Sequence, residues 1–189
     1  LSLTPSEFEN TEKGIEERWL AVEVSHGLGN RLRAFASAHA LATVSGRSLM
    51  VAWLSDVHLS ASLSELFYVP GLVSVDKSFL TCAKHSPQYD VYDYLEHPVD
   101  QHYREKIRDQ AHKHIYVRTA YKVFGESSYA SSDISQFLRS LRPSPGVEML
   151  IQNIKGQLWA DKGKFIEHTI GAHIRMQGDL AKDVPGIYS

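Results

Sequence analysis

Residues 20–54 decide the fold, and they read LAVEVSHGLGNRLRAFASAHALATVSGRSLMVAWL. The first five residues predict a short strand, and the SHGLG that follows predicts a glycine turn. A helix is expected from about residue 30 to residue 45, with Gly46 ending it. Residues 48–54 form a continuous apolar run, which is typical of a strand buried on both faces of a parallel sheet. Strand, turn, helix and strand together make a βαβ unit.

The expected helix is small or apolar at nearly every position except in its first turn, where Arg31 and Arg33 lie. Positive side chains there oppose the helix dipole, which favours negative groups at a helix N-terminus. The two arginines therefore require either solvent or an anionic partner.

The rest of the chain alternates between strand and helix patterns. Loops and one charged helix are expected between residues 89 and 114. This alternation predicts the α/β class, with a Rossmann-like parallel sheet flanked by helices. Further strands are expected over residues 72–75, 115–121 and 169–175, and helices over residues 62–67, 134–141 and 147–159.

The composition bounds the class of protein. The chain has 189 residues, 43% of them apolar, which is enough for one domain with a real core. Its formal charge of -2 gives no broad basic surface for nucleic acid. The single cysteine, Cys82, excludes an internal disulfide and a multi-cysteine zinc site. No apolar stretch approaches the roughly 20 residues needed to span a bilayer, so we expect a soluble chain.

Both ends of the chain suggest a piece of a longer protein. It begins with Leu1 instead of methionine and ends on VPGIYS at residues 184–189, without a closing helix. Residues 1–18 are polar and are expected to form a leader or a short solvated helix.

The first candidate site is residues 26–33, HGLGNRLR. Gly27 and Gly29 let a ligand approach the backbone, and the helix N-terminus that follows favours anions. As a dinucleotide fingerprint the stretch is incomplete, because Leu32 replaces the third glycine and Asp56 is only loosely placed as the ribose-binding acid. A purely structural tight turn is the alternative, and an NAD-dependent dehydrogenase is a third interpretation.

The second candidate site is residues 170–179, IGAHIRMQGD. Strand alternation puts His173 and Arg175 on one face, near the carboxyl end of the expected strand, where open α/β sheets bind ligands. In the alternative interpretation, Arg175 pairs with a carboxylate and His173 is a hydrogen-bonded buried histidine.

Taken together, the two motifs resemble those of the GDP-fucose-dependent fucosyltransferases, which include the α1,6-fucosyltransferases and the protein O-fucosyltransferases. The family's G-x-G-N turn is matched by GLGN at residues 27–30, and its H-x-R motif by HIR at residues 173–175. GRSLMVAW at residues 46–53 and LRPSP at residues 141–145 are similar to two further family patterns. The α1,6-type enzymes carry H-x-R-R, whereas Met176 follows Arg175 here, as in the protein O-fucosyltransferase pattern.

The resemblance implies a GT-B architecture in which this chain is the N-terminal half. Residues 19–165 would form the Rossmann-like N-terminal domain, and residues 166–189 the first strand and loop of a truncated second domain. The parent enzyme would transfer fucose from GDP-fucose to a glycan or protein hydroxyl, and this chain alone would fold but be inactive.

The resemblance also implies roles for individual residues. Arg175 would be catalytic, because a planar arginine stabilises charge that grows on the departing diphosphate. Candidate contacts to the acceptor or a phosphate are Arg31 and Arg33. The donor nucleotide would be bound by His173, Arg175, Gly27, Gly29 and Asn30.

No cofactor is expected, because the GDP-sugar is a substrate and the chain has no D-x-D motif. The histidines at residues 112 and 114 are a weak zinc pattern. Expected partners are a nucleotide sugar and a carbohydrate or glycoprotein acceptor, without nucleic acid and without a membrane span. The resemblance favours the Golgi or ER lumen, or the cytoplasm in a bacterium. The alternative function is a non-catalytic Rossmann-like module that binds carbohydrate or nucleotide.

Overall fold

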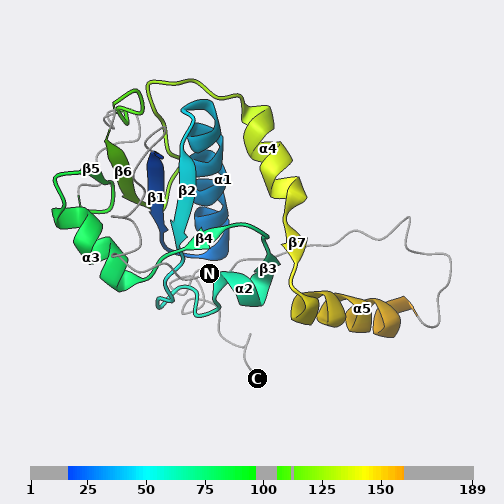
Figure 1. The fold of residues 1–189 in the computed structure, drawn as a ribbon. Coiled ribbons are helices and arrows are strands. Elements are labelled where there is room, and N and C mark those ends of the chain that lie inside the picture. The colour runs from blue at the N-terminus through cyan, green and yellow to red at the C-terminus, as the bar shows by residue number, and fades with distance from the viewer. Residues whose placement is uncertain (1–16, 97–105, 112, 160–189) are drawn as a thin grey trace, which may run out of the picture. The chain divides into compact units, whose positions relative to one another are not determined.

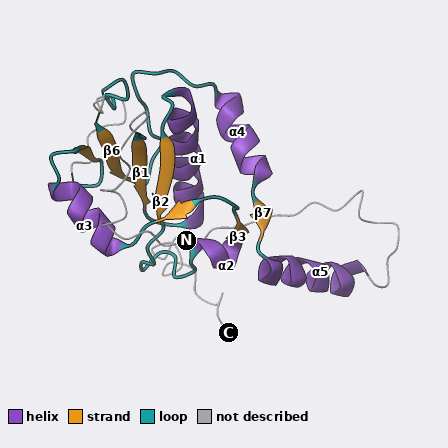
Figure 2. Cartoon of the chain, in the orientation of Figure 1, coloured by secondary structure: helices purple, strands orange, loops and turns teal. Residues whose placement is uncertain are grey.

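Five parallel strands form the sheet at the centre of the protein (Figures 1 and 2). The computed structural model describes residues 17–96, 106–111 and 113–159. The strand order is β4-β2-β1-β6-β5, and each neighbouring pair is parallel. The strands are β1 (Trp19–Val24), β2 (Ser48–Ala52), β4 (Val73–Ser74), β5 (Tyr89–Asp93) and β6 (His114–Thr119).

Helices cover both faces of this sheet. Alternate residues of β1 point to opposite faces, so Leu20 and Val22 pack in one apolar cluster with α1 (Leu28–Val44), while Ala21 packs in a second with α3 (Lys77–His85). Figure 1 shows α1 and α3 on opposite sides of the strands. The fold class is therefore a Rossmann-like α/β arrangement, as the sequence predicts.

The central helix α1 is buried on two sides. One side packs on the sheet through Phe35 and Leu41, and the other packs through Ala36 and Ala40 against Ile134 of α4 (Ser131–Ser140). Because both sides are covered, nearly every position after the first turn is small or apolar.

A glycine ends α1. Gly46 adopts a left-handed conformation with φ +62°, its N–H donates to the carbonyl of Thr43, and the N–H of Arg47 donates to that of Ala42. This is the Schellman pattern of hydrogen bonds, which the expected glycine stop favours.

Arg47 joins this helix end to the loop before β6. It is almost fully buried, and its two terminal nitrogens donate to the carbonyls of Lys113 (2.7 Å), Ala111 (2.6 Å) and Asp109 (3.1 Å). The arginine of the sequence GRSL thus has a structural role here.

The remaining elements are short, apart from the last helix. Ser62 and Glu65 form a capping box at the start of α2 (Leu63–Leu66). β3 (Phe67–Tyr68) pairs antiparallel with β7 (Arg142–Pro143), and α5 spans Pro145–Trp159. The chain divides after Glu148 into two units, and the sheet belongs to the first. None of the helices in the described part is long and apolar enough to cross a membrane.

One expectation for the middle of the chain is wrong, and one helix there is not expected from the sequence. Residues 89–93 form the edge strand β5 instead of a loop. Tyr92 of this strand is buried in the core, whereas the aspartates of YDVYD interrupt the apolar pattern that would have predicted a strand. The sequence pattern does not predict α3, although Asp76 caps this helix by accepting a hydrogen bond from the N–H of Phe79 at 3.0 Å. The stretch expected to contain a charged helix includes residues 97–105, which lie outside the described residues, so that helix stays a prediction.

The other strands and helices expected within the described residues are present, with ends that differ by at most three residues. The expected strand at residues 169–175, most of the leader and the proposed second domain lie outside the described residues.

Candidate functional site

The glycine turn lies at the point where the strand order of the sheet reverses, between β1 and β6. The chain leaves β1 through α1 to reach β2 on one side, whereas β6 lies on the other side of β1. The N–H of Ser25 donates to the carbonyl of Thr119 at 3.1 Å, so the carboxyl ends of β1 and β6 meet directly beside the turn. Open α/β sheets bind ligands at such a reversal, outside the carboxyl ends of the strands.

The turn contains a strained residue, His26. Its φ of +71° places it in the left-handed region, which is costly for a residue with a side chain. Its N–H donates to Oδ2 of Asp56 at 3.2 Å, and its carbonyl accepts a hydrogen bond from Nε of Arg31 at 2.7 Å. These two contacts hold the backbone at the start of α1 in one conformation.

Arg31 is fully buried and points back into the protein. Its Nη1 donates to the carbonyl of Leu54 at 2.7 Å, and its Nη2 lies 2.7 Å from Oδ2 of Asp56. The guanidinium also lies 5.2 Å from the centre of the Trp53 ring, within the range of a cation–π contact. The anionic partner that the sequence requires for this arginine is therefore Asp56.

Asp56 ties the loop after β2 to the turn after β1. Besides Arg31 and His26, it accepts hydrogen bonds from the N–H groups of His58 (2.8 Å) and Leu59 (3.0 Å). Partial burial acts to raise the pKa of this carboxyl, but the three N–H donors and Arg31 outweigh it and hold the pKa below its ordinary value. Asp56 is thus a carboxylate at neutral pH and serves as an anchor of the turn.

The two histidines whose backbone N–H groups bind Asp56 stack their side chains on each other. The rings of His26 and His58 stack with centroids 5.2 Å apart and planes 4° from parallel. Nδ1 of His26 is buried without a hydrogen-bond partner among the described residues, whereas His58 is exposed. Sequence reasoning missed His58, although it follows β2 at the edge where the turn follows β1.

The N-terminus of α1 is open. Gly27 is its N-cap residue and has no side chain that could accept a hydrogen bond, and no acidic residue lies in the first turn. A methyl group added at Gly27 or Gly29 would meet nothing within 4 Å among the described residues. Packing within the described chain thus gives no reason for glycine at either position, whereas a ligand approaching the backbone would.

Asn30 and Arg33 form a small polar pair at this opening. Nη2 of the exposed Arg33 donates to Oδ1 of Asn30, and its Nε donates to the carbonyl of Gly29 at 3.3 Å. Of the first candidate site, Gly27, Gly29, Asn30 and Arg33 therefore lie together at the start of α1. Arg31 is buried beneath them and binds Asp56. The contacts of these residues with a ligand stay a prediction, and His173 and Arg175 lie outside the described residues.

A second polar group lies at the same edge, and sequence reasoning missed it. Arg118 of β6 sits in register between Glu23 of β1 and Asp93 of β5. Its Nε lies 3.3 Å from Oε1 of Glu23, its Nη1 donates to Oδ2 of Asp93 at 3.2 Å, and the Tyr116 hydroxyl donates to Glu23. Burial and the Glu23 carboxylate raise the pKa of Tyr116, so this phenol stays protonated.

Metal ligands do not gather in the described part of the chain. No group of three or more His, Cys, Asp or Glu side chains in it lies close enough together to hold an ion.

Comparisons with known proteins give one structural similarity. No family model matches the chain, and no curated protein matches its sequence. A crystal structure of the NodZ alpha-1,6-fucosyltransferase soaked with GDP-fucose aligns with a TM-score of 0.46 and 14% identity, over 76% of this chain. The alignment spans 56% of the NodZ chain, so this chain corresponds to little more than half of it. The fold assignment rests on the sheet topology described above.

Proposed function

We propose that this chain is the N-terminal half of a glycosyltransferase that moves fucose from GDP-fucose to a hydroxyl group of a glycan or a protein, without a metal ion. The proposed enzyme has a GT-B architecture, in which the Rossmann-like domain described here faces a second domain that binds most of the nucleotide.

One observation carries the proposal. The GLGN stretch at residues 27–30 begins α1 with an uncapped N-terminus, at the point where the strand order of the parallel sheet reverses, and no other described residue fills the space beside either glycine. Such a helix end attracts a diphosphate or another polar ligand, because its N–H groups have no partner within the helix. The ordered resemblance of the sequence motifs to the fucosyltransferases supports the choice of a sugar nucleotide over NAD.

The reaction needs charge stabilisation more than covalent help. The acceptor oxygen forms a bond to C1 of fucose as the bond from C1 to the β-phosphate oxygen breaks, and GDP leaves with the electron pair. The hydroxyl proton passes to a base or to solvent. Negative charge grows on the β-phosphate, and a preorganised arginine typically contributes about 10²–10³ in rate at such a position.

The proposed residue for this role is Arg175, with His173 supporting the nucleotide. Gly27, Gly29 and Asn30 would line the cleft from the first domain, next to the sugar or the acceptor. Arg33 is the candidate for a direct ligand contact at the helix start, because it is exposed, whereas Arg31 is committed to Asp56.

Ligand-dependent thermal protection tests the proposal. This chain and a version extended at its C-terminus are heated with GDP-fucose, GDP-mannose or NAD. GDP-fucose should raise the melting temperature of the extended version, and Arg175→Ala should remove this protection and slow fucose transfer by about 10²–10³. Arg139→Ala, an exposed arginine on α4, is the matched control and should change neither. Protection by NAD alone would refute the proposal, and an Arg175→Ala variant that keeps transfer would refute the role of that residue.

A further inference from the structure

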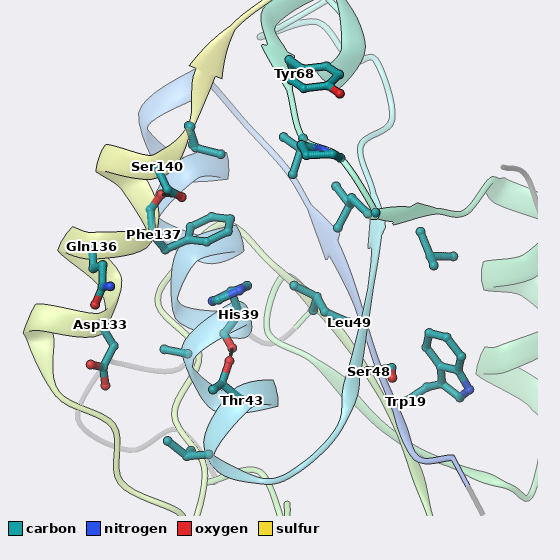
Figure 3. Close-up of a pocket in the computed structure, with 18 of the residues that line it drawn as sticks. Trp19, His39, Thr43, Ser48, Leu49, Tyr68, Asp133, Gln136, Phe137 and Ser140 are labelled. Atoms are coloured by element: carbon teal, nitrogen blue, oxygen red, sulfur yellow. Dashed lines mark hydrogen bonds between the residues drawn. The ribbon is translucent and has the colours of Figure 1, made fainter.

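A large cavity lies at the end of the sheet where β1 and β2 begin, opposite the end that carries the glycine turn (Figure 3). It has a volume of about 940 Å³ and opens between the C-terminal half of α1, the helix α4, the first residues of β1 and β2, and residues 68–73. Its size falls within the range of small-molecule sites, which is about 300–1,000 Å³.

The charges around this cavity select against anions. Glu17 and Asp133 contribute carboxylates, and no lysine or arginine is among the described residues that line it. A phosphate or nucleotide would meet repulsion here and find no positive partner. The charges of the lining therefore exclude an anionic ligand, unlike the one proposed for the opposite end of the sheet.

The imidazole of His39 lines the cavity. His39 of α1 is half-buried and stacks on Phe137 of α4, with ring centroids 4.2 Å apart and planes 26° from parallel. Figure 3 shows the two rings side by side, with Leu49 of β2 across from them. Neither ring nitrogen of His39 has a hydrogen-bond partner among the described residues, so both are available to the hydroxyl groups of a ligand.

The other walls supply apolar and neutral polar contacts. The Tyr68 side chain is 60% exposed, so its ring offers an open flat surface at one end of the cavity. The amide of Gln136 is exposed and has no hydrogen-bond partner in the described chain, so it can both donate and accept. Aromatic faces attract the slightly positive C–H groups of a sugar ring, and neutral amide and imidazole groups match its hydroxyls.

We propose that this cavity binds a neutral saccharide, with a C–H face on Tyr68 and with hydroxyl groups paired to His39 and Gln136. The inference goes beyond the proposed transfer reaction and does not depend on it, because the cavity lies where β1 and β2 begin and the glycine turn lies where β1 ends. In a glycan-modifying protein, such a cavity would hold a part of the glycan remote from the reacting hydroxyl.

Amide NMR of the full chain tests this inference. Methyl glycosides of glucose, galactose, mannose, fucose and N-acetylglucosamine, and a neutral oligosaccharide of each, are added one at a time. At least one should shift the signals of residues 39, 68 and 136 and leave those of residues 27–30 unchanged. Signals that respond to no neutral saccharide, or respond better to a sugar phosphate or an alkyl glycoside tail, would overturn the inference.

Three variants locate the contacts. Tyr68→Ala and Gln136→Ala remove exposed side chains, and His39→Phe keeps an aromatic ring against Phe137 but removes both nitrogens. Each should weaken binding by about tenfold, as expected for the loss of one good contact. Phe124→Ala removes an aromatic side chain that is 52% exposed and lies outside the cavity lining, and it should leave the affinity unchanged. Equal affinity in all four variants would overturn the assigned contacts even if a saccharide binds.

Discussion

The guanidinium of Arg31 and the carboxylate of Asp56 lie 2.7 Å apart, and this contact joins the first turn of α1 to the loop after β2. Arg31 also donates to the carbonyls of His26 and Leu54, one from each loop. Because Asp56 accepts the N–H of His26, the entrance to α1 is held from both sides. The candidate site is thus ordered before a ligand arrives, which lowers the entropic cost of binding.

The first prediction concerns this pair. Asp56→Asn should lower the free energy of unfolding by about 1–3 kcal/mol, because it leaves the buried charge of Arg31 without an anion. Combining it with Arg31→Met should recover part of the loss, since no unpaired charge is then buried. Urea unfolding of the two single variants and the double variant measures the coupling. Additive losses in the double variant would show that the pair does not act as a unit.

The second prediction concerns the pH dependence of the same carboxylate. The pKa of Asp56 is lowered in the folded protein, so its contribution to stability is present above the unfolded pKa of about 3.9 and is lost as the pH falls through the folded value. The stability difference between the wild-type protein and Asp56→Asn should therefore be constant from pH 8 to about pH 5 and shrink under more acidic conditions. An NMR titration of the Asp56 side-chain carbon with a midpoint above about 3.9 would contradict this account.

The third prediction separates two kinds of glycine. A methyl group at Gly125 would lie 2.5 Å from Cδ1 of Leu41 and 2.6 Å from Oδ1 of Asp109, so Gly125→Ala should cost about 1–3 kcal/mol of stability. Gly29→Ala places a methyl group in open space within a helix and should leave stability unchanged or raise it by up to about 1 kcal/mol. Gly29→Ala should still weaken binding of the sugar nucleotide. Thermal unfolding and ligand titration of both variants check this, and normal ligand affinity in Gly29→Ala would argue against a backbone contact there.

The fourth prediction concerns His39. Burial lowers its pKa, so as the pH falls below about 6.5 the unfolded chain takes up a proton before the folded protein does. Stability should decline over this range, and His39→Gln should remove the part of the decline that comes from this residue. Urea unfolding of both proteins at several values between pH 5 and about pH 8 measures the difference. Parallel stability profiles for the two proteins would contradict the assigned burial effect.

The βαβ unit is predictable because its signals are local. Apolar runs mark β1 and β2, and glycines mark both ends of α1. The edge strand β5 is not predictable in the same way, since Asp90 and Asp93 interrupt its apolar pattern and its pairing with β6 is a contact distant in sequence. Short apolar segments at a sheet edge depend on tertiary packing more than on their own propensity.

The candidate site likewise has a part that is predictable from local sequence and a part that depends on contacts distant in sequence. The open helix start is predictable, because Gly27 and Gly29 follow an apolar strand pattern and precede a helical one, although Gly29 itself lies in the first turn of α1. The partner of Arg31 is not, because Asp56 reaches it only when β1 and β2 lie side by side in parallel. The stack of His26 on His58 depends on the same neighbouring strands. The sequence suggests Asp56 only as a ribose-binding acid, whereas in the structure it binds the protein itself.

An amide NMR titration with GDP-fucose, on the chain extended at its C-terminus, tests the central claim most directly. The account predicts that the signals of residues 27–30 shift as GDP-fucose binds, that Gly29→Ala weakens this binding, and that NAD produces no such shifts. Binding of NAD without binding of GDP-fucose, or GDP-fucose binding that leaves the signals of residues 27–30 unchanged, would contradict it.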